Sequence, residues 1–308
     1  FIGSYICLEE IKTNKKIKFA LLSFIFLAIG ASCMQLVLDR GQILDWFSSN
    51  LITNLTIIAI LFLSLFFLLY FIKGKTLFPK EMFLDCNYIG GLIFVFLFGL
   101  LLVPPFILMP DFLSSIGGYP VDKIGIILMT SGIGGMTGTL IASRLLSSGY
   151  YKSIMIIGLL SYMIGQYYMT LWNSEVTMNM MMANGIIRGI GIGLYYPALA
   201  TATYVTLPTK FRDHGASLFQ FIRNLGSAVA IAIIVILMDR FHKINMSELS
   251  ARVKDNYNQN EGLFHNYNLY PLGMNDTNFF ISLITQEAHL ISFINIMVVL
   301  TFLPLIFF

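Results

Sequence analysis

Residues 184–238 read NGIIRGIGIGLYYPALATATYVTLPTKFRDHGASLFQFIRNLGSAVAIAIIVILM, and this stretch decides the fold. It holds two apolar runs that are each long enough to cross a bilayer, joined by the short polar sequence TLPTKFRDHG. Each run carries one arginine, Arg188 or Arg223. A guanidinium at the bilayer centre costs from a few to about 10 kcal/mol, so each should face a partner, a backbone carbonyl or a wet cavity. The stretch indicates a membrane transporter.

Glycines and prolines punctuate the apolar runs. Three glycines follow Arg188 at alternate positions, and such residues let neighbouring helix backbones approach closely. A proline removes one intrahelical hydrogen bond and favours a bend. The helix-packing or hinge positions that we predict are Gly189, Gly191, Gly193, Pro197, Pro104 and Pro105.

The composition fits a polytopic membrane protein. Hydrophobic residues make up 57% and charged residues 11%, with a mean hydropathy of +0.78, whereas soluble domains carry about 25% charged residues. The net charge of +3 is spread over short loops, so we expect no nucleic-acid partner. The environment that we expect is the lipid bilayer.

Eight apolar runs of about the length of a spanning helix can be read along the chain. With the N-terminus inside, the inner connections hold eleven Lys and Arg residues, whereas the short outer ones hold only Arg40 and Lys123. The expected fold is therefore all-α, with eight transmembrane helices. The predicted spans lie at about 19–38, 51–72, 88–115, 122–146, 153–172, 178–206, 214–238 and 289–308.

The connection over about 239–288 is polar, rich in asparagine and, in this orientation, on the outer side. Loops of this length are usually functional or disordered, and a short helix is expected near 245–255. It is the surface where we expect a periplasmic adaptor to bind. Because the chain begins at Phe1 rather than Met, we also expect it to be a fragment or an N-terminally truncated chain.

Three stretches resemble the fourteen-helix drug:proton antiporters of the EmrB/QacA type, in the major facilitator superfamily. They are LDRGQILDWFSSN (38–50), the GxGxGxxxPA run from Gly189 to Ala198, and LPTKFRDHGASLFQFIRNLGSAVAIAI (207–233). The resemblance implies a major facilitator fold, with residues 19–72 as two linking transmembrane helices and 88–308 as the C-terminal six-helix half. Residues 1–18 and 73–87 would be cytoplasmic.

The resemblance also implies a function. The chain would be part of a proton-coupled, alternating-access exporter of drugs or other lipophilic compounds in the inner membrane, as the inner-membrane component of a tripartite pump. The proton would be the coupling ion, with no other cofactor, and the N-terminal half with its proton-coupling carboxylates would be missing here. The alternative is a truncated or decayed fragment that inserts in the membrane and transports nothing.

Both arginines are candidates for the substrate cavity, with alternatives left open. Arg223, with Gln220 and Asn224 at helical spacing, either faces the cavity or extends along its helix to the membrane surface. Arg188 either contacts substrate or makes a structural bond to a carbonyl of a broken helix. Asp111 is either a solvated carboxylate at a helix end or a proton carrier.

Large aromatic and methionine side chains can line an adaptable apolar pocket or serve ordinary helix packing and lipid contact. Phe106 and Met109 belong to this group. The remaining substrate-cavity candidates are Tyr195, Tyr196, Phe219, Met129 and Met136.

We expect neither an enzyme nor a metal site. The four histidines, His214, His242, His265 and His289, show no ligand spacing, and no nucleophile has a base within reach. The three cysteines are scattered without metal or redox spacing, so no disulfide is expected either.

Overall fold

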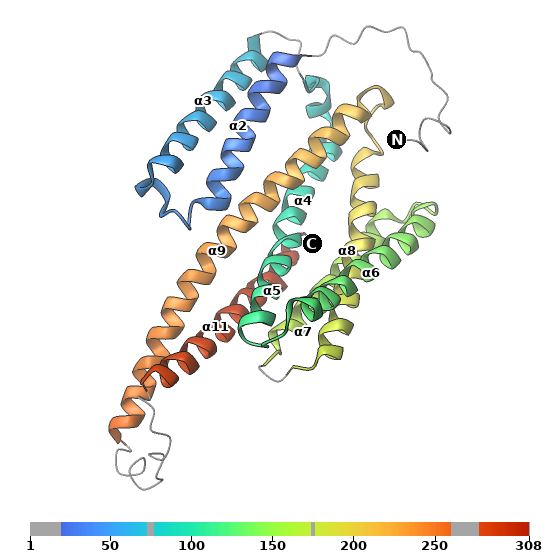
Figure 1. Cartoon of the computed structure of the whole chain (residues 1–308). Helices are drawn as coiled ribbons and strands as arrows, with labels where there is room; N and C mark the ends of the chain where they lie inside the picture. The colour runs from blue at the N-terminus through green and yellow to red at the C-terminus, as the bar shows by residue number, and fades with distance from the viewer. Residues whose placement is uncertain (1–19, 73–76, 174–175, 260–276, 308) are drawn as a thin grey trace.

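A computed structural model describes residues 20–72, 77–173, 176–259 and 277–307, and the described residues form helices without strands (Figure 1). The predicted all-α fold class is thus confirmed. The predicted cytoplasmic segment 1–18 lies outside the described residues. The helices are α2 (Leu21–Arg40), α3 (Asn50–Ile72), α4 (Cys86–Leu102), α5 (Pro104–Ser115), α6 (Val121–Leu146), α7 (Tyr151–Thr170), α8 (Met178–Tyr204), α9 (Arg212–Gln259) and α11 (Thr277–Phe302).

Six stretches of the described chain are long and apolar enough to cross a membrane. They correspond to α2, α3, α4 with α5, α6, α9 and α11. Helices α7 and α8, with 20 and 27 residues, are also long enough, at about 1.5 Å per residue. Both helices carry polar side chains in their apolar runs, among them Gln166 on α7 and Asn184 and Arg188 on α8. The chain is a multi-pass membrane protein, and the count of eight spans stays a prediction.

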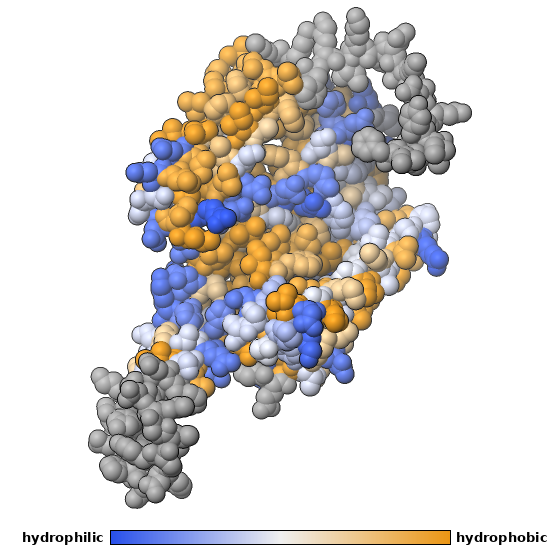
Figure 2. Space-filling model, in the orientation of Figure 1, coloured by the Kyte–Doolittle hydropathy of each residue, from blue (hydrophilic) through white to orange (hydrophobic). Residues whose placement is uncertain are grey.

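The helices form a bundle with a hairpin at its edge (Figure 1). Helix α8 packs between α6 and α7, α4 packs along α9, and α11 contacts both α9 and α7. The α2–α3 hairpin touches the rest mainly through α9, and α3 buries only Ile52, Ala59 and Phe66. Hydrophobic side chains cover this hairpin in the space-filling view (Figure 2). Such an apolar surface is what a lipid-facing pair of helices requires.

A break divides the predicted span 88–115 into α4 and α5. Asp85 caps α4 by accepting hydrogen bonds from the backbone N–H groups of Asn87 and Tyr88. The helix ends at Leu102, and α5 begins with Pro104 and Pro105 after it. Because prolines lack the N–H that would continue the ladder of hydrogen bonds, the chain restarts as a second helix there.

The outer connection predicted at about 239–288 is largely helical, which corrects the expected loop. Helix α9 continues to Gln259, and α11 begins at Thr277, twelve residues before the predicted start at 289. Residues 239–259 contain neither Pro nor Gly, so nothing in the backbone ends the helix. The two extensions also contact each other, since the Thr285 hydroxyl lies 3.9 Å from the Met246 sulfur, and Asn245 donates to the Ser292 hydroxyl further along α11 at 2.9 Å. Residues 260–276 lie outside the described chain.

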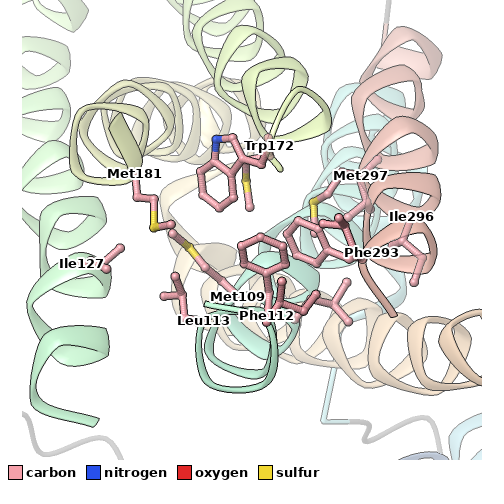
Figure 3. Close-up of a cluster of buried hydrophobic side chains, with 14 of the residues drawn as sticks. Met109, Phe112, Leu113, Ile127, Trp172, Met181, Phe293, Ile296 and Met297 are labelled. Atoms are coloured by element: carbon pink, nitrogen blue, oxygen red, sulfur yellow. The ribbon is translucent and has the colours of Figure 1, made fainter. Parts of the chain in front are cut away.

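The buried core has an outer and an inner part. The outer part, which we call the outer aromatic cluster, gathers side chains of α5, α6, α8 and α11 around Trp172 (Figure 3). Phe112 stacks on Phe293 with ring centroids 4.4 Å apart, and Trp172 lies 5.7 Å from Phe112. The inner part lies where α4, α7, α8 and α9 meet, and includes Phe98, Tyr162, Tyr195 and Phe219.

Close backbone contact joins α8 to both of its neighbours. A Cβ on Gly189 would meet the backbone oxygen of Ser131 and, at 2.8 Å, the backbone nitrogen of Gly135. A Cβ on Gly191 would stand 2.5 Å from the backbone nitrogen of Tyr162 on α7. Only glycine fits at these approaches, so the alternating glycines hold α8 between two helices.

Candidate functional site

A polar group that is partly exposed lies where α8 meets α9, and we call it the exposed arginine cluster. It consists of Tyr196 on α8 with Gln220, Arg223 and Asn224 on α9. The Tyr196 hydroxyl donates to Gln220 Oε1 at 3.0 Å and accepts from Arg223 Nη1 at 3.4 Å. Arg223 Nη2 donates to Asn224 Oδ1 at 3.2 Å. The structure therefore brings four of the predicted cavity residues together.

Aromatic rings surround this cluster. The Arg223 guanidinium lies 5.5 Å from the centroid of the Tyr196 ring, within the range of a cation–π interaction. Phe98 stacks on Tyr196 with centroids 5.5 Å apart. Two other candidates, Tyr195 and Phe219, are 2% and 1% exposed, so they support the cluster from within the core and do not line an open face.

The two methionine candidates lie elsewhere. Met129 and Met136 are 57% and 72% exposed on α6, seven residues apart and hence on one face of that helix. This face is one that packs against no other described helix. The small cavity bordered by Tyr162 and Tyr195 has a volume of about 10 Å³, which is the size of one water molecule and cannot hold a drug.

Arg188 is in a different setting, because it is fully buried near the middle of α8. Its Nη2 donates to the Ser131 hydroxyl at 3.0 Å, and Nη1 lies 3.3 Å from the thioether sulfur of Met169. The guanidinium stands 5.8 Å from the Phe106 ring. No carboxylate pairs with Arg188 among the described residues, and its Nε has no acceptor there. A buried charge without an ionic partner costs several kcal/mol.

Sequence reasoning missed the residues around Arg188. Gln166 on α7 and Asn184 on α8 are 0% and 5% exposed. Both Gln166 side-chain polar atoms and Asn184 Oδ1 lack partners among the described residues. Two signals were present in the sequence. Asn184 precedes Arg188 by one helical turn, and Gln166 is the only carboxamide in the apolar run 153–172.

Asp111 forms a pair that was not predicted. His289 Nε2 lies 2.8 Å from Asp111 Oδ2, which joins α11 to α5, and the His242 ring is 5.8 Å from that of His289. The histidines 242 and 289 are thus far apart only in sequence. Within the described residues no three His, Cys, Asp or Glu side chains form a group that could hold a metal ion.

Comparison with known proteins identifies relatives of one kind. No family model matches the chain. It is 22% identical to the multidrug export protein EmrB of Haemophilus influenzae, over 82% of this chain and 49% of that protein. It is 23% identical to the probable multidrug resistance protein EmrY of Escherichia coli, over 82% of this chain and 50% of that protein. The fatty acid resistance protein FarB of Neisseria gonorrhoeae is 24% identical, over 73% of this chain and 44% of that protein.

The match confirms the resemblance to antiporters of the EmrB type that the three sequence stretches indicated, and it concerns transport proteins, not enzymes. The chain spans about half the length of the curated relatives it matches. It is thus similar, along most of its own length, to proteins of multidrug export and resistance.

Proposed function

We propose that this chain belongs to a proton-coupled exporter of drugs or other lipophilic compounds, which works by alternating access in the inner membrane. The observation that carries the proposal is the exposed arginine cluster. Gln220 and Asn224 are exposed and Arg223 is half-buried, on helices long enough to span the bilayer. Polar side chains at such depth normally border a protein interior or a wet cavity, since lipid offers them no hydrogen bonds.

The depth of Arg223 supports this assignment. It comes eleven residues after the start of α9, which is about 16 Å along the helix axis. With the bilayer core beginning at the start of α9, the guanidinium would lie about half-way through its thickness of about 30 Å. The neighbouring rings of Tyr196 and Phe98 provide an apolar surface beside the polar groups, a combination suited to lipophilic molecules that carry some polar atoms.

The proposed exporter also needs a second half, which this chain does not supply. Alternating access needs two halves that move around a shared site, and this chain matches about half of each relative. We place the proton-coupling carboxylates in that second portion, with the proton as the only coupling ion. Arg188, Tyr196, Gln220, Arg223 and Asn224 would be the contribution of this chain to the cavity.

We further propose that a periplasmic adaptor contacts the outer extensions of α9 and α11, as in a tripartite pump. These extensions contact each other through Met246 and Thr285 and form the projection at the lower left of Figure 1. Lys243 on this projection is exposed and pairs with Asp239 at 2.7 Å, so its polar surface is open to a partner. In this proposal the adaptor would connect the exporter in the inner membrane to the outer membrane.

The test is accumulation of a lipophilic dye in cells that lack their own pumps. We would compare the chain alone with the chain joined to the N-terminal portion of an EmrB-type relative. The joined form should lower dye retention severalfold, and a protonophore should abolish the effect. If the joined form reaches the membrane and leaves the retention of a broad dye panel unchanged, export is contradicted and the inactive-fragment alternative is supported.

A further inference from the structure

A titratable group joins the outer parts of α5, α9 and α11, three helices that contact one another (Figure 1). The Nε2 atom of His289 on α11 lies 2.8 Å from Oδ2 of Asp111 on α5. The ring of His242 on α9 meets the His289 ring edge to face, with centroids 5.8 Å apart. We call Asp111, His242 and His289 the outer histidine group. It shares no residue with the exposed arginine cluster, so it is separate from the surface proposed for substrate.

The outer solution reaches this group. The side chains of Asp111 and His289 are 53% and 23% exposed. Lys243, which follows His242, has a side chain that is 72% exposed. Charged side chains of this kind mark the membrane surface. A proton can therefore enter or leave His289 from the outer side without crossing the bundle.

Protonation of His289 strengthens its contact with Asp111. A neutral imidazole gives the carboxylate one hydrogen bond, whereas an imidazolium adds the attraction between opposite charges. Histidine side chains generally gain and lose their proton between about pH 5 and 8. The contact between α11 and α5 should therefore be strong at the acid end of this range and weaken as the pH rises through it.

The outer histidine group favours one bound proton over two. If both rings were charged, two positive charges would stand with ring centroids 5.8 Å apart, and the one carboxylate lies beside His289. The Nδ1 atom of His242 is buried and has no partner among the described residues. A proton added there would gain no acceptor. Of the two rings, His289 is thus the one that takes the proton.

Asp111 is the carboxylate that responds to this proton. Asp239, one turn before His242, already accepts from Gln42 and Lys243. Within the described chain, no other carboxylate pairs with a ring of the group. The charged side chains that the surrounding helices carry in their outer parts, apart from Asp111, are Asp39 and Arg40 on α2, Asp122 and Lys123 on α6, Asp239, Arg240, Lys243 and Glu248 on α9, and Glu287 on α11.

Helix α5 is the element that this contact would hold or release. It has 12 residues and begins after the break at Val103, so it can turn about that break as a short unit. Besides the contact between Asp111 and His289, the Gln286 side chain of α11 donates to the backbone oxygen of Ile116 at the end of α5, at 3.3 Å. The contact through His289 depends on charge, and the contact through Gln286 does not.

We propose that the outer histidine group is a proton-binding site, at which a proton from the outer side holds α5 against α11 and closes the outer side of the exporter. This inference rests on the proposed function and adds a proton-responsive contact in this half. A ligand shifts an equilibrium toward the state that binds it more tightly, and the closed state is the one that places Asp111 beside His289. An acidic outer solution would thus favour closure after a compound has left.

The first test measures the contact between α5 and α11 and needs no transport. Nitroxide labels would be attached to Ser114→Cys on α5 and Leu283→Cys on α11, two exposed positions, in the full chain with its own cysteines replaced by serine. In lipid nanodiscs, electron paramagnetic resonance would give the distance between the labels. From pH 8 to pH 5.5 the ratio of short to long distances should rise about twofold to fivefold, the effect of one partly exposed ion pair.

Variants assign this pH dependence to residues. His289→Gln and Asp111→Asn keep polar side chains of similar size and remove the charge pair, so each should abolish the pH dependence. Gln286→Leu is the matched control, because it removes the uncharged contact between the same two helices. It should lower the share of short distances at both pH values and keep the change between them. His242→Gln removes the other histidine and should keep that change as well.

Some outcomes would overturn the proposal. One is a distance ratio that does not respond to pH in the parent chain, and another is a response that survives in both His289→Gln and Asp111→Asn. Loss of the response in His242→Gln, with the response kept in His289→Gln, would assign the proton to the other ring and overturn His289 as the site. Because the two decisive variants lie on different helices, one of them decides if the other does not fold.

Transport separates this inference from the proposed function. In cells that contain no adaptor, dye export by the joined form at outer pH 6 should fall about twofold to fivefold in His289→Gln. Glu287→Gln removes an exposed charge of α11 outside the group and should leave export at the parent rate. An unchanged rate in His289→Gln overturns the role in closure. A distance that responds to pH through His289, in a joined form that exports no compound, contradicts the proposed function and supports the proton site.

Discussion

The two membrane-embedded arginines occupy opposite environments in neighbouring parts of one bundle. Arg188 is 1% exposed and faces α6 and α7, where glycines bring the backbones together. Arg223 is half-buried on α9, where it donates to the Tyr196 hydroxyl and to Asn224 Oδ1. Arg188 stands near the middle of α8, which has 27 residues, whereas Arg223 lies eleven residues after the start of the 48-residue α9.

The difference shows how the same residue type acquires two roles. Around Arg223, each polar neighbour already has a partner within the cluster, so the group is stable while partly exposed. Near Arg188, both side-chain polar atoms of Gln166 and the Oδ1 atom of Asn184 have no partner among the described residues. The exposed cluster is therefore suited to broad contact with passing molecules.

The largest expected effect comes from breaking the contact that buries Arg188. In Gly189→Ala the new Cβ would collide with the backbone of Ser131 and Gly135 on α6, and backbone atoms cannot rotate away. We expect a loss of about 3 kcal/mol in stability, at the upper end for overpacking. Unfolding of the purified protein in detergent by SDS titration would measure it.

Gly132→Ala is the matched control for this prediction. A Cβ at Gly132 on α6 would meet nothing within 4 Å. Because alanine favours the helix by about 1 kcal/mol over glycine, this variant should be as stable as the parent or more so. Equal destabilisation by the two alanines would contradict the assigned role of close backbone contact.

The second effect concerns transport and the exposed cluster. Arg223→Met removes the charge and keeps much of the side-chain volume, so the cluster loses its cation. Dye export by the joined form should fall about tenfold, the effect of losing one charge-assisted hydrogen bond to substrate. Stability should change by less than about 1 kcal/mol, because the side chain is partly solvated.

Arg223→Lys and Arg240→Met complete the comparison. Lysine keeps the charge and loses the planar fork, so export should recover in part. Arg240→Met removes an exposed charge from the same helix and, in cells that contain no adaptor, should leave export unchanged. If Arg223→Met exports the dye at the parent rate, Arg223 serves packing and the cluster is not a substrate surface.

Much of the fold followed from apolar length and from the glycine pattern. The apolar runs predicted some helices closely, as for the span 122–146, which is α6 (Val121–Leu146), whereas the predicted span 88–115 divides at Val103, next to the predicted hinge positions Pro104 and Pro105. The prediction was wrong in extent over 239–259, where a loop with a short helix near 245–255 was expected although nothing in the backbone chemistry ends α9 before Gln259. Polarity determines where a helix leaves the membrane, and Pro, Gly and capping groups determine where it ends.

The candidate sites were harder to predict, for a reason of geometry. Tyr196, Gln220 and Arg223 could be proposed together because two of them lie at helical spacing on α9. Gln166 could not be joined to Arg188 from sequence, since it is on another helix and the contact depends on which face of α7 meets α8. The exposed state of Met129 and Met136 depends on packing in the same way.

The smallest effect separates the hydroxyl of Tyr196 from its ring. Tyr196→Phe keeps the ring that lies 5.5 Å from the Arg223 guanidinium and removes the oxygen that links Gln220 to Arg223. Because the hydrogen bond is partly exposed and Gln220 can turn to water, stability should fall by about 0.5 kcal/mol. Dye export should fall about twofold, as Arg223 keeps Asn224 and becomes less well positioned.

Tyr196→Leu is the variant that sharpens this last prediction. It removes the ring as well, so the guanidinium loses its cation–π partner and Phe98 loses a stacked neighbour. Export should then approach that of Arg223→Met, and combining the two changes should add little, since both act through one guanidinium. Fully additive losses would mean that Tyr196 contacts the exported compound independently of Arg223, and the cluster would then consist of two separate contacts.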